Sequence, residues 1–499
     1  MVQKKMLVES DPHETRIAVV EGEQLTELFI ERHQHLGLVG NIYKGRVNRV
    51  LPGMQAAFVD IGLERDAFLY VNEVLDPLAS YRDFEVGETD SVELPRALAR
   101  PSIDSLLQPG QELIVQVLKD ALPNKGARVS TQITLPGRYL VLLPNVPHVG
   151  VSRRIGNEEE RHRLRLLLDE VRPATDGLIV RTAGEGSGPE ELTGDLSVLS
   201  VLWDRIRRRG EKVAAPTLLH RDLDLALRII RDYLTEDFSD VWVEGEGTFV
   251  RILEFLEQIQ PALVDRVRLF ERESALFEHF GIEPEIEAAL KTKVWLKSGG
   301  HIVINPTEAL VAIDVNTGRF VGRRNLEETV LTTNLEAVRE IVRQIRLRNL
   351  GGIIVIDLID MVDPEHRDQV FQVLAAELAR DRSKNKVLNI SEFGLVEITR
   401  KRSRPSLERQ LTQPCPYCNG TGRIRSLETI CLDLRRRVLR RAQQLRGREV
   451  LLRVHPDVAQ ALQQEDRQVL IELEAELGTE ILIQSDPQLH HENFDVLEV

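Results

Sequence analysis

Two aspartates in this sequence each end a short apolar run of the kind that forms a buried strand. Asp314 ends Leu310-Val311-Ala312-Ile313-Asp314, and Asp357 ends Ile353-Ile354-Val355-Ile356-Asp357. Ligand crevices form at the carboxyl ends of strands in α/β sheets, so two such side chains that converge could hold Mg²⁺ through oxygen atoms. Bound Mg²⁺ could activate water and stabilise charge on a phosphodiester oxygen. The alternative is that each Asp only caps the following loop or helix. With Asn316 beside the first Asp and Asp360 near the second, both interpretations stay open.

A second candidate site is the pair of cysteines in Cys415-Pro416-Tyr417-Cys418, followed by Gly420 and Gly422. This spacing is half of a zinc knuckle, in which glycines let backbone amides face the thiolates. A structural zinc needs four ligands, and Cys431, thirteen residues further on, has no partner cysteine. The missing pair could therefore come from a second copy of the chain. The competing interpretation is a redox Cys-x-x-Cys motif, which usually opens a helix, and the Gly-x-Gly here disfavours a helix.

Two further segments have residues suited to binding nucleic acid. Gly40 to about Ile133 is rich in short strands and glycine corners, with Phe58, Phe68 and Lys125 interleaved. Such a pattern suits an OB-type barrel that stacks bases on aromatic rings and neutralises phosphates, and its spacing resembles an S1 RNA-binding domain. The alternative is that at least one phenylalanine packs in the core.

The other segment is Gly177-Leu178-Ile179-Val180-Arg181-Thr182-Ala183-Gly184, an apolar strand that delivers Arg181 and Thr182 into a glycine-rich loop. A guanidinium, a hydroxyl and exposed backbone N–H groups together can form a pocket for a terminal phosphate. An arginine at a strand end is also commonly part of a surface ion pair, and this alternative stays open.

Several kinds of element must position these residues. Arg16 to Glu31 alternates apolar and polar residues around Glu21-Gly22-Glu23, which predicts a hairpin, and a second β-rich stretch is predicted from Leu135 to about Leu192. From about Leu223 onward, amphipathic helices alternate with short strands, which indicates α/β layering. A long helix is predicted over Leu326 to Arg348, before the stop at Gly351-Gly352.

Composition limits the possible classes of protein. The chain has 499 residues, enough for roughly three to four domains, and a net charge of −14, which argues against charge-driven binding to polyanions over the whole surface. Three cysteines do not form a secreted disulfide framework. No apolar run approaches the roughly 20 residues that span a bilayer, and Met1 to Glu9 lacks a signal-peptide core. We therefore expect a soluble, cytoplasmic protein without a membrane span.

Nearly the whole chain resembles the bacterial ribonuclease E/G family, and its compact C-terminal end is similar to the shorter members. Ordered motifs carry the resemblance: Gly40 to Gly45, Gly53 to Gly62, Ile179 to Gly184, Ala309 to Asn316, Asn334 to Ala337, Gly351 to Met361 and Cys415 to Gly422. The resemblance implies a Mg²⁺-dependent endoribonuclease that cuts single-stranded, A/U-rich RNA, leaves 5′-phosphate and 3′-hydroxyl ends, prefers 5′-monophosphorylated RNA, and works in rRNA processing and mRNA decay.

The resemblance also implies roles for individual residues. Asp314 and Asp357 would hold Mg²⁺, with Asn316 assisting near the scissile phosphate. A 5′-monophosphate would be bound by Arg181, Thr182, Gly137, Val141 and Arg153. Phe58, Phe68 and Lys125 would contact RNA. Cys415 and Cys418 would share zinc between the two subunits of a homodimer, and whether dimers pair further into tetramers stays open.

The implied fold class is multidomain α+β, with domains arranged in a defined order. The expected parts are a discontinuous RNase H-like domain (1–37 and 226–290), an S1 domain of OB-type β-barrel fold (38–132) with an insert (76–105), a 5′-sensor region (133–225), a DNase I-like catalytic α/β domain (291–411), a zinc link (412–424) and a small C-terminal domain (425–499). Composition and periodicity alone show only the α/β layering. Two other classes of function remain: a catalytically silent RNA-binding factor, and a Mg²⁺ nuclease that acts on DNA.

Overall fold

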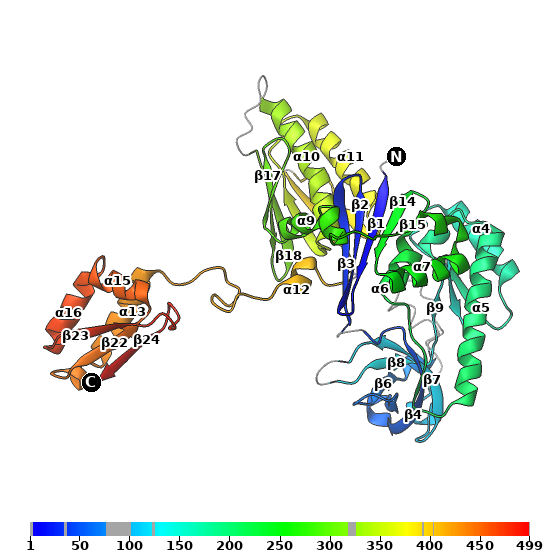
Figure 1. Ribbon diagram of the computed structural model, residues 1–499, viewed down its shortest axis with the longest axis horizontal. Helices are drawn as coiled ribbons and strands as arrows, with labels where there is room; N and C mark the ends of the chain where they lie inside the picture. Colours follow the sequence, from blue (N-terminus) through cyan, green and yellow to red (C-terminus); the bar gives the residue numbers. More distant parts are fainter. Residues whose placement is uncertain are drawn as a thin grey trace. The chain divides into compact units, whose positions relative to one another are not determined.

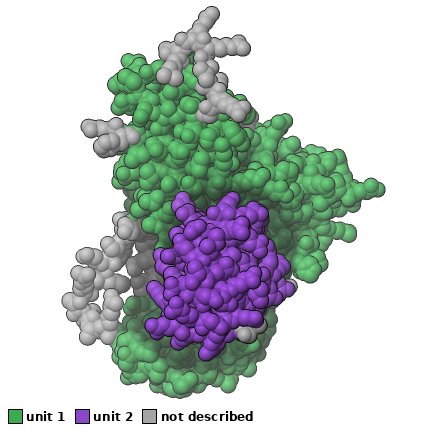
Figure 2. All heavy atoms as spheres, turned by 90° about the vertical axis from the view of Figure 1, so that its left-hand side faces the viewer, with its two compact units in different colours: residues 1–410 green, residues 411–499 purple. Residues whose placement is uncertain are grey.

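The structure is a computed structural model that describes residues 3–33, 37–75, 101–121, 125–317, 326–391, 394–402 and 404–498. The chain forms two compact units, Met1–Gln410 and Leu411–Val499, shown in different colours in Figure 2. Within the described residues, the first unit contains a five-stranded barrel and three further sheets, and the second contains one small sheet with helices. The protein is thus a multidomain α+β chain. Among the described residues, no helix is both long and apolar enough to cross a membrane.

The N-terminal strands belong to a mixed five-stranded sheet with the order β15-β14-β1-β2-β3. The predicted hairpin forms, and its neighbour β1 pairs in parallel with β14, a strand more than two hundred residues later in the chain. Apolar side chains such as Met6, Ile17 and Phe238 pack against helices α6 and α7. The elements are β1 (Lys4–Ser10), β2 (Glu14–Glu21), β3 (Gln24–Arg32), α6 (Leu225–Tyr233), β14 (Phe238–Glu244), α7 (Glu246–Ile259), η4 (Pro261–Arg266), β15 (Val267–Leu269), α8 (Leu276–His279) and α9 (Ile282–Ala289).

The barrel closes because β4 pairs with both β5 and β7, while β13 adds to its side. Small and branched residues such as Ala57, Val59 and Leu69 fill its interior. Most of the insert predicted at 76–105 lies outside the described residues, but its end forms α3, whose Ile103 enters the core. The elements are β4 (Ile42–Leu51), η2 (Pro52–Met54), β5 (Ala56–Asp60), β6 (Ala67–Tyr70), α1 (Asn72–Leu75), α3 (Ile103–Leu106), β7 (Glu112–Lys119), β8 (Arg128–Ser130) and β13 (Thr217–His220).

A four-stranded sheet with the order β11-β12-β10-β9 follows the barrel. The prediction of a β-rich stretch through Leu192 is wrong over Glu158–Val171, which forms helix α4. The side chain of Asn157 caps this helix by accepting hydrogen bonds from Glu159 N and Glu160 N, and Leu164 and Leu168 are buried against the sheet. The elements are β9 (Leu135–Pro136), β10 (Leu140–Leu143), β11 (Val149–Val151), α4 (Glu158–Val171), β12 (Gly177–Val180), η3 (Thr182–Gly184) and α5 (Pro189–Lys212).

The last sheet of the first unit has the order β16-β17-β18-β19-β21-β20, and only β18 and β19 pair in parallel. Helices α10 and α11 lie against one face of it (Figure 1) and bury alternate residues such as Val311, Ile313 and Ile354. The residues between these, including Ala312, Asp314 and Ile353, are exposed on the opposite face, here called the open face. The elements are β16 (Lys293–Trp295), β17 (His301–Pro306), β18 (Leu310–Asn316), α10 (Leu326–Leu347), β19 (Gly352–Asp357), α11 (Pro364–Ala379), β20 (Asn385–Val387), β21 (Leu395–Arg400) and α12 (Leu407–Leu411).

The C-terminal unit has a three-stranded sheet in which β22 pairs in parallel with β23 and antiparallel with β24. Helices α13, α15 and α16 contribute Leu434, Leu462 and Leu473 to its core. Cys431 is buried there too, unlike the loop cysteines, of which Cys415 is exposed and Cys418 is partly exposed. The elements are α13 (Leu427–Arg440), α14 (Ala442–Leu445), β22 (Val450–Val454), α15 (Pro456–Gln463), α16 (Arg467–Leu477), β23 (Ile481–Ser485) and β24 (Phe494–Glu498).

Candidate functional site

Asp314 and Asp357 are direct neighbours on the open face. Strands β18 and β19 run in parallel, and their register places Asp314 opposite Asp357. Adjacent strands lie about 4.8 Å apart, and side chains at paired positions point to the same side of the sheet. Both carboxylates are exposed. The fold therefore brings together the two acids that the sequence singled out, although Asp314 lies two residues before the end of β18 while Asp357 is the last residue of β19.

The hydrogen bonds around these carboxylates favour a site for a cation over a cap. Asn316 donates from its side-chain nitrogen to Asp314 Oδ2 at 2.6 Å, and neither Asp314 nor Asp357 caps a helix within the described residues. No salt bridge joins either carboxylate to a basic residue in the part of the chain that the structure describes. Two adjacent negative charges without a basic partner, with an amide oxygen alongside, form a set of hard oxygen ligands that suits Mg²⁺.

Polar residues of α10 hold the loops that flank this pair. Asn334 is completely buried, and its side chain both donates to Ile359 O at 2.8 Å and accepts from Ile359 N at 3.1 Å. The carboxylate of Glu336 accepts hydrogen bonds from Lys297 N at 2.6 Å and Ser298 N at 3.1 Å. These contacts fix the loop after β19 and the turn before β17, so the motif Asn334 to Ala337 has a positioning role.

A glycine next to the same turn keeps β17 close to β18. A Cβ atom at Gly300 would lie 2.8 Å from Asn316 O and 3.1 Å from a Thr333 methyl carbon. Any larger residue would therefore push against the end of β18, where Asp314 and Asn316 are placed.

Sequence reasoning missed the aromatic and imidazole groups beside the acids on the open face. His301 is paired with Asn316 across β17 and β18, and its ring lies 5.2 Å from the ring of Trp295, whose side chain is 65% exposed. The Lys293 ammonium lies 4.1 Å from the Trp295 ring centre. Burial, then the charge of Lys293, lower the pKa of His301, while the charge of Asp314 acts in the opposite direction. The sequence did offer a signal for these residues, because side chains two positions apart on β16 and β17 share a face of the sheet.

The two barrel phenylalanines are neighbours on the outer surface. Phe58 and Phe68 occupy paired positions on β5 and β6, with ring centres 5.5 Å apart, and both are half-buried while Ala57, Val59 and Leu69 fill the interior. The alternative that one of them belongs to the barrel interior is therefore wrong.

Further groups extend this aromatic surface. Tyr70, which sequence reasoning missed, lies 4.2 Å from Phe68, and Arg49 and Arg128 flank the rings of Phe58 and Tyr70. Lys125 is exposed at the start of the segment that leads into β8. A row of aromatic rings bordered by cations can stack bases and contact phosphates.

Arg181 is held by an acidic partner that the sequence did not reveal. Its Nη1 donates to Asp232 Oδ1 at 2.8 Å and to Gly137 O at 2.6 Å. Arg231 forms two further hydrogen bonds to the same carboxylate, at 2.8 and 3.0 Å. Burial raises the pKa of Asp232, but the two guanidinium groups outweigh it and hold that pKa well below its usual range. Arg181 is thus part of an ion pair, but this pair is mostly buried, whereas the alternative was a pair on the surface.

Other predicted residues of the phosphate pocket are only partly brought together. Arg181 and Val141 line one cavity of about 270 Å³, together with Gln116, Thr134 and Arg228. Thr182 Oγ1 lies 3.1 Å from Ser152 Oγ, and Arg153 is exposed in the turn after β11 and does not line this cavity.

Gly137 has a packing role that explains its small size. A Cβ atom there would lie 2.6 Å from the Asp195 carboxylate, which accepts hydrogen bonds from the backbone of Arg138, Tyr139 and Leu140 at 2.8 to 3.1 Å. Gly137 therefore lets helix α5 approach the loop and presents its carbonyl group to Arg181.

The loop cysteines have the local geometry of a thiolate ligand pair. Gly422 N–H donates to Cys418 Sγ at 3.3 Å, and this bond is the main cause that lowers the pKa of Cys418. The loop residues Cys415 to Gly422 form turns and no helix, which disfavours the redox alternative. Burial raises the pKa of Cys431 to about 12, so this thiol is a core residue. No third histidine, cysteine or carboxylate joins Cys415 and Cys418 within the described part of the chain.

Comparison with known proteins identifies the family. The model of the ribonuclease E/G family matches residues 134–403, and the model described as the RNase E/G thioredoxin-like domain matches residues 414–499. Ribonuclease G of Escherichia coli strain K12 is 42% identical over 493 residues, and that of Haemophilus influenzae 41% over 496, with 99% of both chains covered in each case. Ribonuclease E of Haemophilus influenzae is 39% identical over 498 residues, which are 52% of its length. The resemblance predicted from the motifs is confirmed, and the chain belongs to the ribonuclease E/G family.

Proposed function

We propose that this nuclease is a Mg²⁺-dependent endoribonuclease that cuts single-stranded, A/U-rich RNA and leaves 5′-phosphate and 3′-hydroxyl ends. The observation that supports it most is the parallel register that pairs Asp314 with Asp357 on the open face. This face is not covered by the helices that bury the other side of the sheet, so an extended RNA strand can reach the acids. The relatives named ribonuclease G support RNA as the substrate.

In this proposal, Asp314, Asp357 and Asn316 form the catalytic centre. The two carboxylates hold Mg²⁺, and the bound ion supplies Lewis acidity and a more acidic water. Asn316 keeps Asp314 in place through its 2.6 Å hydrogen bond and contacts the scissile phosphate with its remaining amide capacity. Asn334 and Glu336 position the neighbouring loops and do not touch the substrate.

RNA binding and end recognition use the other two surfaces. Phe58 and Phe68 stack bases, and Lys125 contacts the backbone. The 5′-monophosphate is bound by Arg181 and Thr182, with Gly137, Val141 and Arg153 around it. Because the Arg181 guanidinium already donates a hydrogen bond to Asp232, the phosphate must either share this guanidinium with the Asp232 carboxylate or displace the carboxylate from it. A 5′-hydroxyl end carries no charge with which to compete, so the enzyme prefers 5′-monophosphorylated RNA.

The domain roles follow the same proposal. Residues 38–132 serve as an S1 domain, 1–37 with 226–290 as an RNase H-like domain, 133–225 as the 5′-sensor region and 291–411 as a DNase I-like catalytic domain. The pairing of β1 with β14 supports joining the two segments of the RNase H-like domain. The enzyme acts in the cytoplasm on rRNA precursors and mRNA.

The zinc link at 412–424 joins two subunits, and 425–499 form the small C-terminal domain. Cys415 and Cys418 offer two ligands, and tetrahedral zinc needs four. A second copy of the chain supplies the other two, so the active unit is a homodimer that can pair further into a tetramer.

The test is a panel of single-stranded oligomers incubated with Mg²⁺ or EDTA. The substrates are 5′-monophosphorylated RNA, 5′-hydroxyl RNA and 5′-monophosphorylated DNA of the same A/U- or A/T-rich sequence. We expect Mg²⁺-dependent cutting of RNA, faster with the 5′-monophosphate, and loss of cutting in Asp314→Asn with RNA affinity retained. Glu308→Gln, an exposed acid in the turn before β18, is the matched control and should cut normally.

Each outcome separates the classes of function. Equal cutting of DNA would make the protein a general Mg²⁺ nuclease. RNA binding without cutting in Mg²⁺ would make it a silent binding factor. Full activity of Asp314→Asn would overturn the assignment of the catalytic pair.

A further inference from the structure

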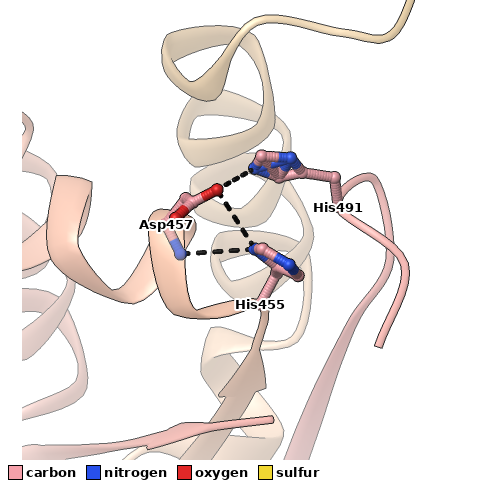
Figure 3. Close-up of side chains that lie close together, drawn as sticks. All are labelled: His455, Asp457 and His491. Carbon is pink, nitrogen blue, oxygen red and sulfur yellow. Dashed lines mark hydrogen bonds and ion pairs between the residues drawn. The ribbon is translucent and has the colours of Figure 1, made fainter. Parts of the chain in front are cut away.

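Two histidines and an aspartate converge at one end of the C-terminal sheet. His455 directly follows β22, Asp457 lies in the first turn of α15, and His491 lies in the loop that leads to β24 (Figure 3). The parallel and antiparallel pairings of β22 with β23 and β24 bring this loop beside the start of α15. His491 is far from the other two residues in sequence, so the sheet creates the cluster.

The distances within the cluster suit the coordination of a small transition-metal ion. Asp457 Oδ2 lies 3.2 Å from His491 Nε2 and 3.6 Å from His455 Nδ1, and the ligand atoms of all three residues lie within 4.8 Å of one another. Tetrahedral zinc with bonds of about 2.0–2.2 Å places its ligands roughly 3.3–3.6 Å apart. The Asp457 side chain is 57% exposed, which leaves a route for an ion and a position for water.

The ring nitrogens that face Asp457 have few hydrogen bonds within the described residues. His491 Nε2 is buried, and among the described residues it has no hydrogen-bond partner and only the 3.2 Å contact with the Asp457 carboxylate. His455 Nδ1 accepts only a long bond of 3.3 Å from Asp457 N. The centres of the two imidazole rings lie 4.3 Å apart, at an interplanar angle of 45°.

The neighbouring histidine shows what a satisfied ring looks like. His490 Nε2 donates to Tyr417 O at 2.7 Å, and its Nδ1 accepts from Glu492 N at 3.1 Å. His490 therefore has no nitrogen left for a ligand. Unlike His490, the residues His455, Asp457 and His491 have side-chain atoms that could still bind a ligand.

We propose that His455, Asp457 and His491 bind a divalent transition-metal ion of the zinc type, one per chain. Imidazole nitrogen and carboxylate oxygen are ligands for Zn²⁺, Co²⁺ and Ni²⁺, whereas Mg²⁺ and Ca²⁺ prefer all-oxygen sites. The site is separate from the thiol pair and needs no second chain. Binding ties the loop before β24 to helix α15. The same loop contacts Tyr417 of the cysteine loop: His490 Nε2 donates to the Tyr417 carbonyl oxygen, and His491 N–H donates to the Tyr417 hydroxyl. Metal binding therefore also stiffens the surroundings of Cys415 and Cys418.

Metal content per chain tests the proposal, using full-length protein without a polyhistidine tag. After loading with Zn²⁺ and desalting, the double variant Cys415→Ser/Cys418→Ser should keep about one zinc per chain. Adding His491→Ala should bring this to about zero, and adding Asp457→Asn should weaken zinc binding at least tenfold. His455 is left unchanged because it also caps α15. Adding His162→Ala, an exposed histidine on α4, is the control and should change nothing.

Cobalt loading identifies the ligands independently of stoichiometry. Co²⁺ in the cysteine-free variant should show visible ligand-field bands without the sulfur-to-metal charge-transfer band that thiolates give, and His491→Ala should remove these bands. A cysteine-free protein that holds no zinc or cobalt above the His491→Ala background would overturn the proposal. Equal loss of metal in the His162→Ala control would also overturn it, because the binding would then be non-specific.

Discussion

The open face and the phosphate pocket both place charged side chains side by side, but they balance the charge in opposite ways. On the open face, Asp314 and Asp357 are adjacent carboxylates that share no salt bridge with a described basic residue. In the pocket, Asp232 is bound by two arginines and is mostly buried. In the proposed function the first site takes up a cation from solution, whereas the second site already contains its counter-ions. Substitutions at the two sites should therefore differ in whether they affect activity or stability.

The largest effect should come from Asp357→Asn on the open face. We expect cleavage to fall by orders of magnitude, because one of two ligands for Mg²⁺ is lost. Since like charges at paired sheet positions destabilise, the thermal midpoint in EDTA should stay the same or rise. Single-turnover cleavage and calorimetry measure the two quantities. A variant that is both inactive and much less stable would mean that Asp357 is a structural residue.

Asp232→Asn should show the opposite pattern, with a large loss of stability. Removing one partner from a buried ion pair costs about 3 kcal/mol, more than a hundredfold in the folding equilibrium. Because the folded pKa lies below the unfolded value of about 3.9, the ionised carboxylate stabilises the wild type above that pH. This stabilisation is lost as pH falls through the folded pKa. Urea unfolding should therefore show a smaller difference in unfolding free energy between the wild type and Asp232→Asn at pH 3 than at pH 7. The same difference at both pH values would contradict the ion pair.

Arg181→Ala should act on substrate choice. A charged hydrogen bond to phosphate contributes roughly 1.5–3 kcal/mol, so the preference for 5′-monophosphorylated over 5′-hydroxyl RNA should fall roughly 10- to 100-fold. Arg231 keeps its two bonds to Asp232, so the protein should still fold. Competition between the two RNAs measures the preference, and Arg165→Ala on α4 serves as the control for loss of surface charge. If Arg181→Ala kept the full preference for 5′-monophosphorylated RNA, Arg181 would not take part in recognising the 5′ end.

Thr182→Val should give the smallest change. It removes a neutral hydroxyl that lies 3.1 Å from Ser152 Oγ while keeping the shape of the side chain. A neutral hydrogen bond is worth about 0.5–1.5 kcal/mol, so the end preference should fall only about two- to tenfold. The same competition assay measures it. A loss as large as that of Arg181→Ala would mean that Thr182 holds the loop in place.

Runs of apolar residues in the sequence were sufficient to predict the strands that carry Asp314 and Asp357. The structure adds that Val311, Ile313 and Val315 are buried while Ala312 and Asp314 between them are exposed, an alternation that the continuous apolar run did not predict. Helix α4 was missed because most of its residues are charged and only Leu164 and Leu168 are buried, although Asn157 followed by three glutamates is a helix-start signal.

Contacts between distant segments could not be predicted in this way. Asp232 lies on α6 and contacts Arg181, which follows β12. His491 lies near Asp457 because β24 pairs with β22. Such pairs have no period in the sequence, because only the three-dimensional fold sets their distance. The aromatic row was partly accessible: Tyr70 stands two residues after Phe68 on one strand, so it shares a face with it.

The parallel pairing of β1 with β14 sets an order of events during synthesis. Strand β1 ends at Ser10, and β14 begins only at Phe238. At 5–20 residues per second, a ribosome needs about 10–45 s to make the intervening chain. During that interval the hairpin exposes an unpaired edge, while the barrel strands between the two halves can already close. Lys4 and Lys5 stand at the start of this edge, and such charges discourage pairing with other nascent chains until the proper partner emerges.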